Sequence, residues 1–116
     1  MAVTGSNEMA TFKDIKKFID IADELHSLDE VTKWVRDNRF DKRGYCQHIA
    51  ALYHYVKSGK VVKAPGHVAY LYDNEVYDPI YFREVPVPLS RWRVKFPRFE
   101  IGYPIPVSYT HLTLPT

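Results

Sequence analysis

The sequence predicts an α+β domain in which N-terminal helices are packed on a small antiparallel sheet. Apolar residues recur at helical spacing from about residue 11 to residue 56, and from about Lys60 onward they alternate with polar residues. Helices followed by a run of strands are typical of α+β folds with antiparallel sheets. A length of 116 residues leaves room for one domain, which we expect to span residues 11–106.

The first two helices are expected to begin at residues suited to capping. Thr11 precedes an apolar stripe that comprises Phe12, Ile15, Phe18, Ile19, Ala22 and Leu25. Ser27 and Glu30 have the spacing of a capping box, and this second helix is expected to end near Asn38. Its inner face is expected to comprise Leu28, Val31, Trp34 and Val35.

A third helix is expected from about Tyr45 to Val56, with Gly44 as its N-cap and a stop at Ser58-Gly59. Cys46 then lies in its first turn. A helix N-terminus favours the thiolate form of cysteine, because free N–H groups and the helix dipole place partial positive charge there. Cys46 is therefore a candidate nucleophile, and the alternative is a small buried residue on the apolar stripe.

The second half of the sequence is expected to form short strands joined by turns. The strands and their alternatives are Val61-Val62, His67 to Tyr72, Glu75 to Tyr81, Arg83 to Pro88 as an edge strand or loop, and Arg91 to Phe96. A tight turn at Asp73-Asn74 makes His67 to Tyr81 a hairpin in which Tyr70 pairs with Tyr77 and Ala69 with Asp78.

One face of this hairpin is mainly aliphatic and is expected to pack against a helix; it carries His67, Ala69, Leu71, Val76, Asp78 and Ile80. His67 and Asp78 are diagonal neighbours, and a hydrogen bond between them would satisfy both groups and orient the imidazole. The alternative is a core histidine, with Asp78 capping the turn before Pro79. The opposite face carries Tyr70, Tyr72 and Tyr77. These tyrosines would either line a binding surface or pack under the proline-rich segment.

Three residue types occur in an order typical of nucleophilic catalysis. A cysteine lies at a helix start, a histidine follows at a strand start, and an acid lies on the next strand. They would serve as a nucleophile, a base and the group that orients the base. The stretches GYCQHIAAL (residues 44–52), GHVAYL (66–71) and VYDP (76–79) resemble the core of transglutaminase-like cysteine peptidases in the papain-like superfamily. The HVAYL stretch is also similar to NlpC/P60-type peptidases.

The resemblance implies a papain-like core, with Cys46 as the nucleophile, His67 as the base and Asp78 as the orienting acid. It implies a thiol-dependent hydrolase or acyltransferase that acts on amide or peptide bonds of a peptide or protein through a thioester. The interval between Cys46 and His67 is short, and Trp34 and Asn38 are candidates for an oxyanion partner by position only. The alternative is a catalytically inactive peptidase-like binding module, derived from a phage or mobile element.

Composition argues against other partners. A net charge of +2 is too small to predict a nucleic-acid or membrane surface, and a single cysteine excludes an internal disulfide. No cofactor is expected, nor a metal, because Cys46, His48 and His54 lack ligand spacing. The basic and aromatic stretch 91–99 is either a single-stranded nucleic-acid surface or, as we expect, a strand with an aromatic inner face.

The two ends of the chain are expected to lie outside the domain. Residues 1–10 are small and polar, as in a disordered start or a cloning remnant. The final VSYTHLTLPT (residues 107–116) is similar to a translated adapter, so a non-native tail is expected there. Neither a signal peptide nor an apolar run of membrane-spanning length is visible, which predicts a cytoplasmic protein.

Overall fold

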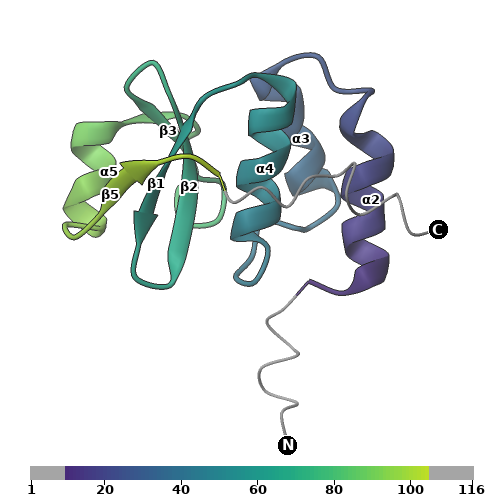
Figure 1. Cartoon of the computed structure of the whole chain (residues 1–116), viewed down its shortest axis with the longest axis horizontal. Coiled ribbons are helices and arrows are strands. Elements are labelled where there is room, and N and C mark those ends of the chain that lie inside the picture. Colours follow the sequence, from purple (N-terminus) through teal and green to yellow (C-terminus); the bar gives the residue numbers. More distant parts are fainter. Residues whose placement is uncertain (1–9, 105–116) are drawn as a thin grey trace, which may run out of the picture.

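Three helices lie on one side of a five-stranded sheet and a fourth lies on the other, in the computed structural model, which describes residues 10–104 (Figure 1). The first three helices are α2 (Phe12–Ala22), α3 (Leu28–Asp37) and α4 (Cys46–Val56). The remaining elements are β1 (Lys60–Ala64), β2 (His67–Tyr72), β3 (Glu75–Tyr77), β4 (Val87–Pro88), α5 (Leu89–Lys95) and β5 (Glu100–Gly102). Every strand pairing is antiparallel, in the order β4-β3-β2-β1-β5. The predicted α+β class is confirmed.

Both expected N-caps of the first two helices are present. The Thr11 side chain accepts the Asp14 N–H at 3.1 Å, and the Ser27 side chain accepts the Glu30 N–H at 3.1 Å. The expected stripe is wrong at its first position, because Phe12 is 68% exposed. None of the helices in residues 10–104 has the length and apolar character needed to cross a bilayer. The expectations for residues 1–9 and 105–116 lie outside the described residues.

The start of α4 differs from expectation by one residue, because its N-cap is Tyr45 rather than Gly44. Gly44 has a φ of 95° and turns the chain just before the helix. The Tyr45 ring packs against Phe18 and Phe40, with centroid distances of 6.3 and 5.2 Å. Cys46 is therefore the first residue of α4, and the side chain of its N-cap residue, Tyr45, makes no capping hydrogen bond.

Two tight turns set the register of the strands that follow. Gly66, with a φ of 74°, closes the β1–β2 hairpin beside Pro65. Asp73 and Asn74 have φ values of 52° and 66°, which matches the right-handed twist of the β2–β3 hairpin. Tyr70 pairs with Tyr77 as predicted.

The third strand is shorter than expected, and this matters for the site. It ends at Tyr77 rather than Tyr81, so the expected pairing of Ala69 with Asp78 does not form. The Asp78 side chain instead accepts the N–H groups of Ile80 and Tyr81, at 3.2 and 3.3 Å. A side-chain turn of this kind replaces the strand ladder and bends the chain away from β2.

The helices cover the face that carries the tyrosines, which corrects the expected outward position of that face. Tyr70 and Tyr77 belong to the core cluster built with α2, α3 and α4, and Tyr53 of α4 stacks on Tyr70 at 5.2 Å. Tyrosine can be buried here because its hydroxyl finds partners: Tyr53 bonds Thr32 at 2.6 Å, and Tyr70 donates to the Lys57 carbonyl.

The aliphatic face does pack against a helix, but that helix is α5. Ala69, Leu71 and Val76 join Trp92 in a second core cluster. The segment 91–96, expected as a strand, lies within this helix and its C-cap. Trp92 and Phe96 are four residues apart, as helical packing requires, while Val94 is 80% exposed. The expectation failed because the alternation Arg-Trp-Arg-Val-Lys-Phe also fits one helical face.

Of the two edge strands of the sheet, one was predicted and the other was not. Val87 pairs with Val76, so the proline-interrupted segment forms the edge strand β4. On the other edge, β5 pairs with β1 through Ile101 and Val62. No strand was expected at β5, where only three residues are paired.

Gly59 provides a test of the packing between α4 and the sheet. A Cβ at this position would lie 2.6 Å from the Tyr70 hydroxyl oxygen and 2.9 Å from the Leu71 carbonyl oxygen. We expect Gly59→Ala to lower the free energy of unfolding by about 1–3 kcal/mol, since the backbone must shift. Urea unfolding measures the change. Gly102→Ala is the control, because its Cβ would meet only ordinary contacts at 3.7 Å. Equal stability of the two variants would contradict this packing.

Candidate active site

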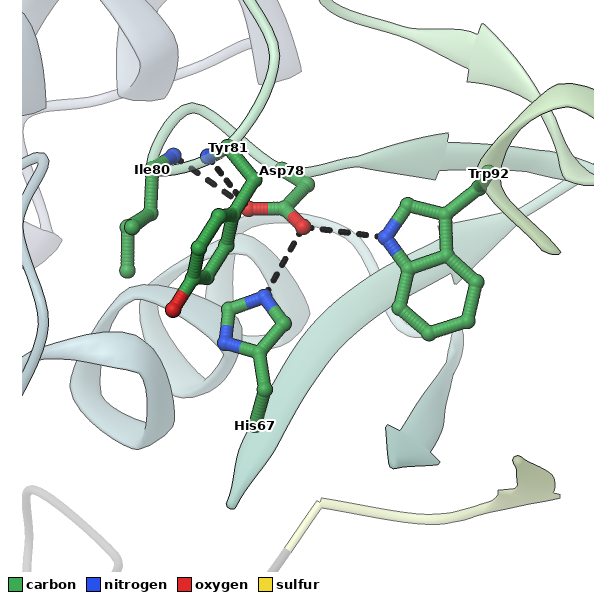
Figure 2. A network of polar contacts seen from close by, with 5 residues as sticks. All are labelled: His67, Asp78, Ile80, Tyr81 and Trp92. Carbon is green, nitrogen blue, oxygen red and sulfur yellow. Dashed lines mark hydrogen bonds and ion pairs between the residues drawn. The ribbon is translucent and has the colours of Figure 1, made fainter. Parts of the chain in front are cut away.

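Cys46, His67 and Asp78 come together at one end of the sheet. They occupy the first position of α4, the first position of β2 and the residue directly after β3. Cys46 and His67 line the same pocket, and His67 lies close enough to lower the pKa of the Cys46 thiol. The His67 Nε2 atom lies 2.8 Å from Asp78 Oδ2, and the other ring nitrogen points away from Asp78 (Figure 2). The structure therefore brings the three residues together in the predicted order, with His67 between Cys46 and Asp78.

Asp78 is held by four hydrogen-bond donors although only 2% of the residue is exposed. Oδ2 accepts from His67 and from the indole N–H of Trp92 at 2.9 Å, and Oδ1 accepts from the backbone N–H groups of Ile80 and Tyr81 (Figure 2). Every lone pair that faces the protein is used, so the buried charge is compensated and the carboxylate has one orientation.

Trp92 is a site residue that the sequence analysis missed. Its indole N–H and His67 donate to the same oxygen of Asp78. The signal was present as the four-residue spacing of Trp92 and Phe96, which places both rings on one helical face. Reading the segment as a strand obscured this placement.

Aromatic rings fix the plane of the His67 imidazole. Phe96 stacks on it at a centroid distance of 5.1 Å, and Tyr81 meets it edge-on at 4.6 Å. His67 is 8% exposed. With Asp78 at one nitrogen and rings on its sides, the imidazole has little freedom except toward Cys46.

The short β3 explains how Cys46 reaches His67. By strand alternation, His67 lies on the face of β2 that packs against α5, whereas α4 covers the opposite face. The β3 pairing with β2 stops at Tyr70, and the chain bends away at Asp78. The edge of β2 at His67 is therefore accessible from the α4 side. The predicted contact between His67 and Asp78 does form, but it depends on this bend and not on diagonal positions in a longer hairpin.

The charges of the pair favour a thiolate and an imidazolium. Burial by itself raises the pKa of the Cys46 thiol, but hydrogen bonds from His67 and from the N–H groups of Val68 and Gln47 lower it below its usual value. Burial by itself lowers the pKa of His67, but hydrogen bonds to Asp78 and Cys46 raise it to about 9. The two shifts act in the same direction, because each makes the charged form of its residue more stable beside the other.

A pocket of about 320 Å³ opens beside the sulfur. Gln47 and Ala50 of α4 form one side, and Ala64 and Val68 of the β1–β2 hairpin form another. This volume is at the small end of ligand pockets. The pocket can therefore hold a compact group next to the Cys46 sulfur.

The proposed oxyanion partners from the N-terminal half are engaged elsewhere. Trp34 packs against Phe18 and Phe40, at centroid distances of 5.0 and 5.4 Å, and Asn38 donates to the Trp34 carbonyl at 2.9 Å. Neither lines the pocket at Cys46. Gln47 does, although the sequence analysis did not single it out.

The other candidate residues do not form a second site. His48 packs on the Phe18 ring at 6.0 Å, and burial lowers its pKa. His54 accepts the Gly59 N–H at 3.1 Å. Within residues 10–104, no three side chains of histidine, cysteine, aspartate or glutamate are grouped as a metal site requires. The buried Trp92 is also unable to stack on a nucleic-acid base.

Comparison with known proteins does not assign a function to this site. No protein-family model, curated protein or solved structure matches the chain. The function is therefore inferred from the positions and chemistry of the residues themselves.

Proposed function

We propose that this protein is a thiol-dependent hydrolase or acyltransferase of the transglutaminase-like type, acting on amide or peptide bonds. The observation that carries the proposal is the position of the Cys46 thiol beside His67, whose ring hydrogen-bonds to the buried Asp78 carboxylate at 2.8 Å. Nucleophile, proton carrier and orienting acid are the three groups that covalent acyl transfer requires.

The reaction begins with the Cys46 thiolate and the His67 imidazolium. The sulfur attacks the carbonyl carbon of the substrate, and the C–N bond breaks as His67 gives its proton to the leaving amine. The product is a thioester on Cys46 and a neutral His67. Water or a second amine then attacks the thioester and gives a proton to His67, which restores the ion pair and releases an acid or a new amide.

The start of α4 supplies stabilisation for the oxyanion that forms during each attack. The Tyr45 side chain does not cap this helix end, which leaves the Cys46 N–H to the substrate oxygen, next to the positive end of the helix dipole. The Gln47 side chain lies at the same pocket. These groups take the role first considered for Trp34 and Asn38.

The proposal places the protein in a reducing compartment, the cytoplasm. A cysteine with a lowered pKa is the form most readily oxidised, so the free thiolate must be kept reduced to react.

A catalytically inactive binding module is the second candidate. It is favoured by the 8% exposure of His67 and by the engagement of Trp34 and Asn38 away from Cys46. In that case the three residues would serve mainly as a buried polar network that stabilises the fold.

Alkylation by iodoacetamide separates the two candidates, because Cys46 is the single cysteine in the sequence. At pH 6 we expect Cys46 to react roughly tenfold faster than free cysteine, since the gain in thiolate outweighs its lower intrinsic nucleophilicity. Cys46→Ala should take up no label, and mass spectrometry of intact protein reads the result. A rate no faster than that of free cysteine would support the inactive module instead.

A further inference from the structure

The pocket beside Cys46 contains a lysine that the reaction described above does not use. Lys63 of β1 lines the pocket together with Cys46 and His67. The other described residues that line it are neutral, and none is an aspartate or glutamate. The pocket therefore carries a net positive charge next to the nucleophile.

Strand register places Lys63 on the side of the sheet where the pocket lies. It pairs with Val68, which also lines the pocket, and directly paired residues share a face. The Lys63 ammonium extends toward β5, where it lies 3.7 Å from the Cβ position that a side chain at Gly102 would have.

Lys63 has no ion-pair partner among the described residues. Glu100 stands opposite it on β5, yet the salt bridges within residues 10–104 join other residues. A lysine that points its charge at solvent is ordinary, but here the charge borders a concave site with no acidic wall. An anionic group that entered the pocket would meet this ammonium.

The rest of the pocket restricts the size of the occupant. Ala50, Ala64 and Gly66 contribute little or no side chain, and the volume is about 320 Å³. Apolar walls of this kind suit a short aliphatic segment, with one polar anchor to orient it. A compact acyl group with a charge at its far end fits these two properties.

We propose that the site takes acyl donors whose acyl part is short and carries a carboxylate, which Lys63 binds while Cys46 attacks the carbonyl carbon. This inference rests on the proposed function. The acyl group lies in the pocket between α4 and the β1–β2 hairpin, and the leaving amine lies on the His67 side, where it receives its proton. Lys63 is then a specificity-determining residue that favours acidic over neutral acyl groups.

The test compares two alkylating reagents of nearly the same size, iodoacetate and iodoacetamide. Both form an S–C bond at Cys46 and release iodide, but only iodoacetate carries a carboxylate. Lys63→Met should lower the ratio of the iodoacetate rate to the iodoacetamide rate by about fivefold, because an opposite charge is lost from the pocket. Lys63→Arg should keep the ratio near that of the wild type.

Lys60→Met is the matched control, since Lys60 is an exposed lysine of the same strand that does not line the pocket. Its ratio should equal that of the wild type. An unchanged ratio in Lys63→Met, with fast alkylation by iodoacetamide, overturns the inference and leaves the proposed function standing. Slow alkylation by both reagents in the wild type overturns both proposals.

Discussion

Replacing His67 with glutamine is expected to slow the alkylation of Cys46 at pH 6 by roughly 30-fold. His67 lowers the pKa of the Cys46 thiol, because its ring can donate a proton toward the sulfur and supplies the neighbouring positive charge. Without them the thiol is mostly protonated at pH 6, and the higher nucleophilicity of a more basic thiolate offsets only part of that loss. The rate of iodoacetamide incorporation measures the effect.

The dependence of the alkylation rate on pH separates a change in the thiol pKa from a loss of folded protein. In the wild type the alkylation rate falls only as the pH drops through the lowered pKa of Cys46. In His67→Gln the rate should keep rising toward the ordinary thiol pKa, so the ratio of rates at pH 9 and pH 6 increases. His26→Gln, an exposed histidine outside the site, should keep the wild-type ratio. The same ratio in His67→Gln would show that the imidazole does not act on the sulfur.

The rate of substrate turnover is expected to fall at high pH, because turnover also depends on the protonation of His67. Cleavage of the C–N bond requires the imidazolium, which is lost as the pH rises through the His67 pKa of about 9. Alkylation needs only the thiolate and should continue above that pH. If turnover falls above pH 9 while alkylation continues, the difference identifies the step in which His67 gives its proton to the leaving amine.

Asp78→Asn is expected to have the largest effect on stability, a loss of about 3 kcal/mol in the free energy of unfolding. The carboxylate accepts four hydrogen bonds in a buried position, and an amide group would direct a donor at Trp92 or His67 or leave the imidazolium without its counter-charge. Thermal or urea unfolding measures the loss. Asp20→Asn is the control, because that aspartate lies in an exposed pair with Lys16, and its loss should be within about 0.5 kcal/mol.

The pH dependence of stability identifies the electrostatic part of this effect. A histidine whose pKa is raised on folding stabilises the fold fully below its unfolded pKa of about 6.5, and this contribution disappears as the pH rises through the folded value. In Cys46→Ala the thiol no longer titrates and no longer raises the pKa of His67, so stability should fall as the pH rises from about 6.5 through the folded pKa that Asp78 alone keeps raised. Adding Asp78→Asn should flatten that slope. A slope that stays the same would assign the contribution of Asp78 to packing and backbone hydrogen bonds.

Trp92→Phe gives an intermediate variant in this series. It removes one donor to Asp78 Oδ2 and keeps an aromatic ring against Phe96, so a loss of about 1 kcal/mol is expected. A loss equal to that of Asp78→Asn would mean that the indole packing, not the carboxylate, dominates the stability of this region.

Much of the local structure followed from neighbouring residues alone. The caps at Thr11 and Ser27 and the tight turn at Asp73-Asn74 use hydrogen bonds and backbone conformations that a few adjacent side chains determine. The same local patterns placed Cys46 at a helix start and His67 at a strand start. For this reason the candidate triad could be predicted before any packing was known.

Tertiary structure alone decided how these elements are used. The tyrosine face of the hairpin became the helix-covered core because Tyr53 of α4 stacks on Tyr70 and the Lys57 carbonyl accepts a hydrogen bond from the Tyr70 hydroxyl. The segment 91–96 became helical because Trp92 gains burial and a hydrogen bond to Asp78 from that placement. Local alternation fits a strand and a helix face equally well here, and only contacts distant in sequence separate the two.

The sequence by itself determined the fold class, the order of the elements as far as β4 and the three residues that we propose as nucleophile, base and acid. The tertiary structure decided the end of β3, the contact of Trp92 with Asp78 and the pocket at Lys63. The physical reason is that caps and turns form among residues a few positions apart. Burial of a face and the shape of a cavity depend instead on surfaces that meet only when the whole chain has folded.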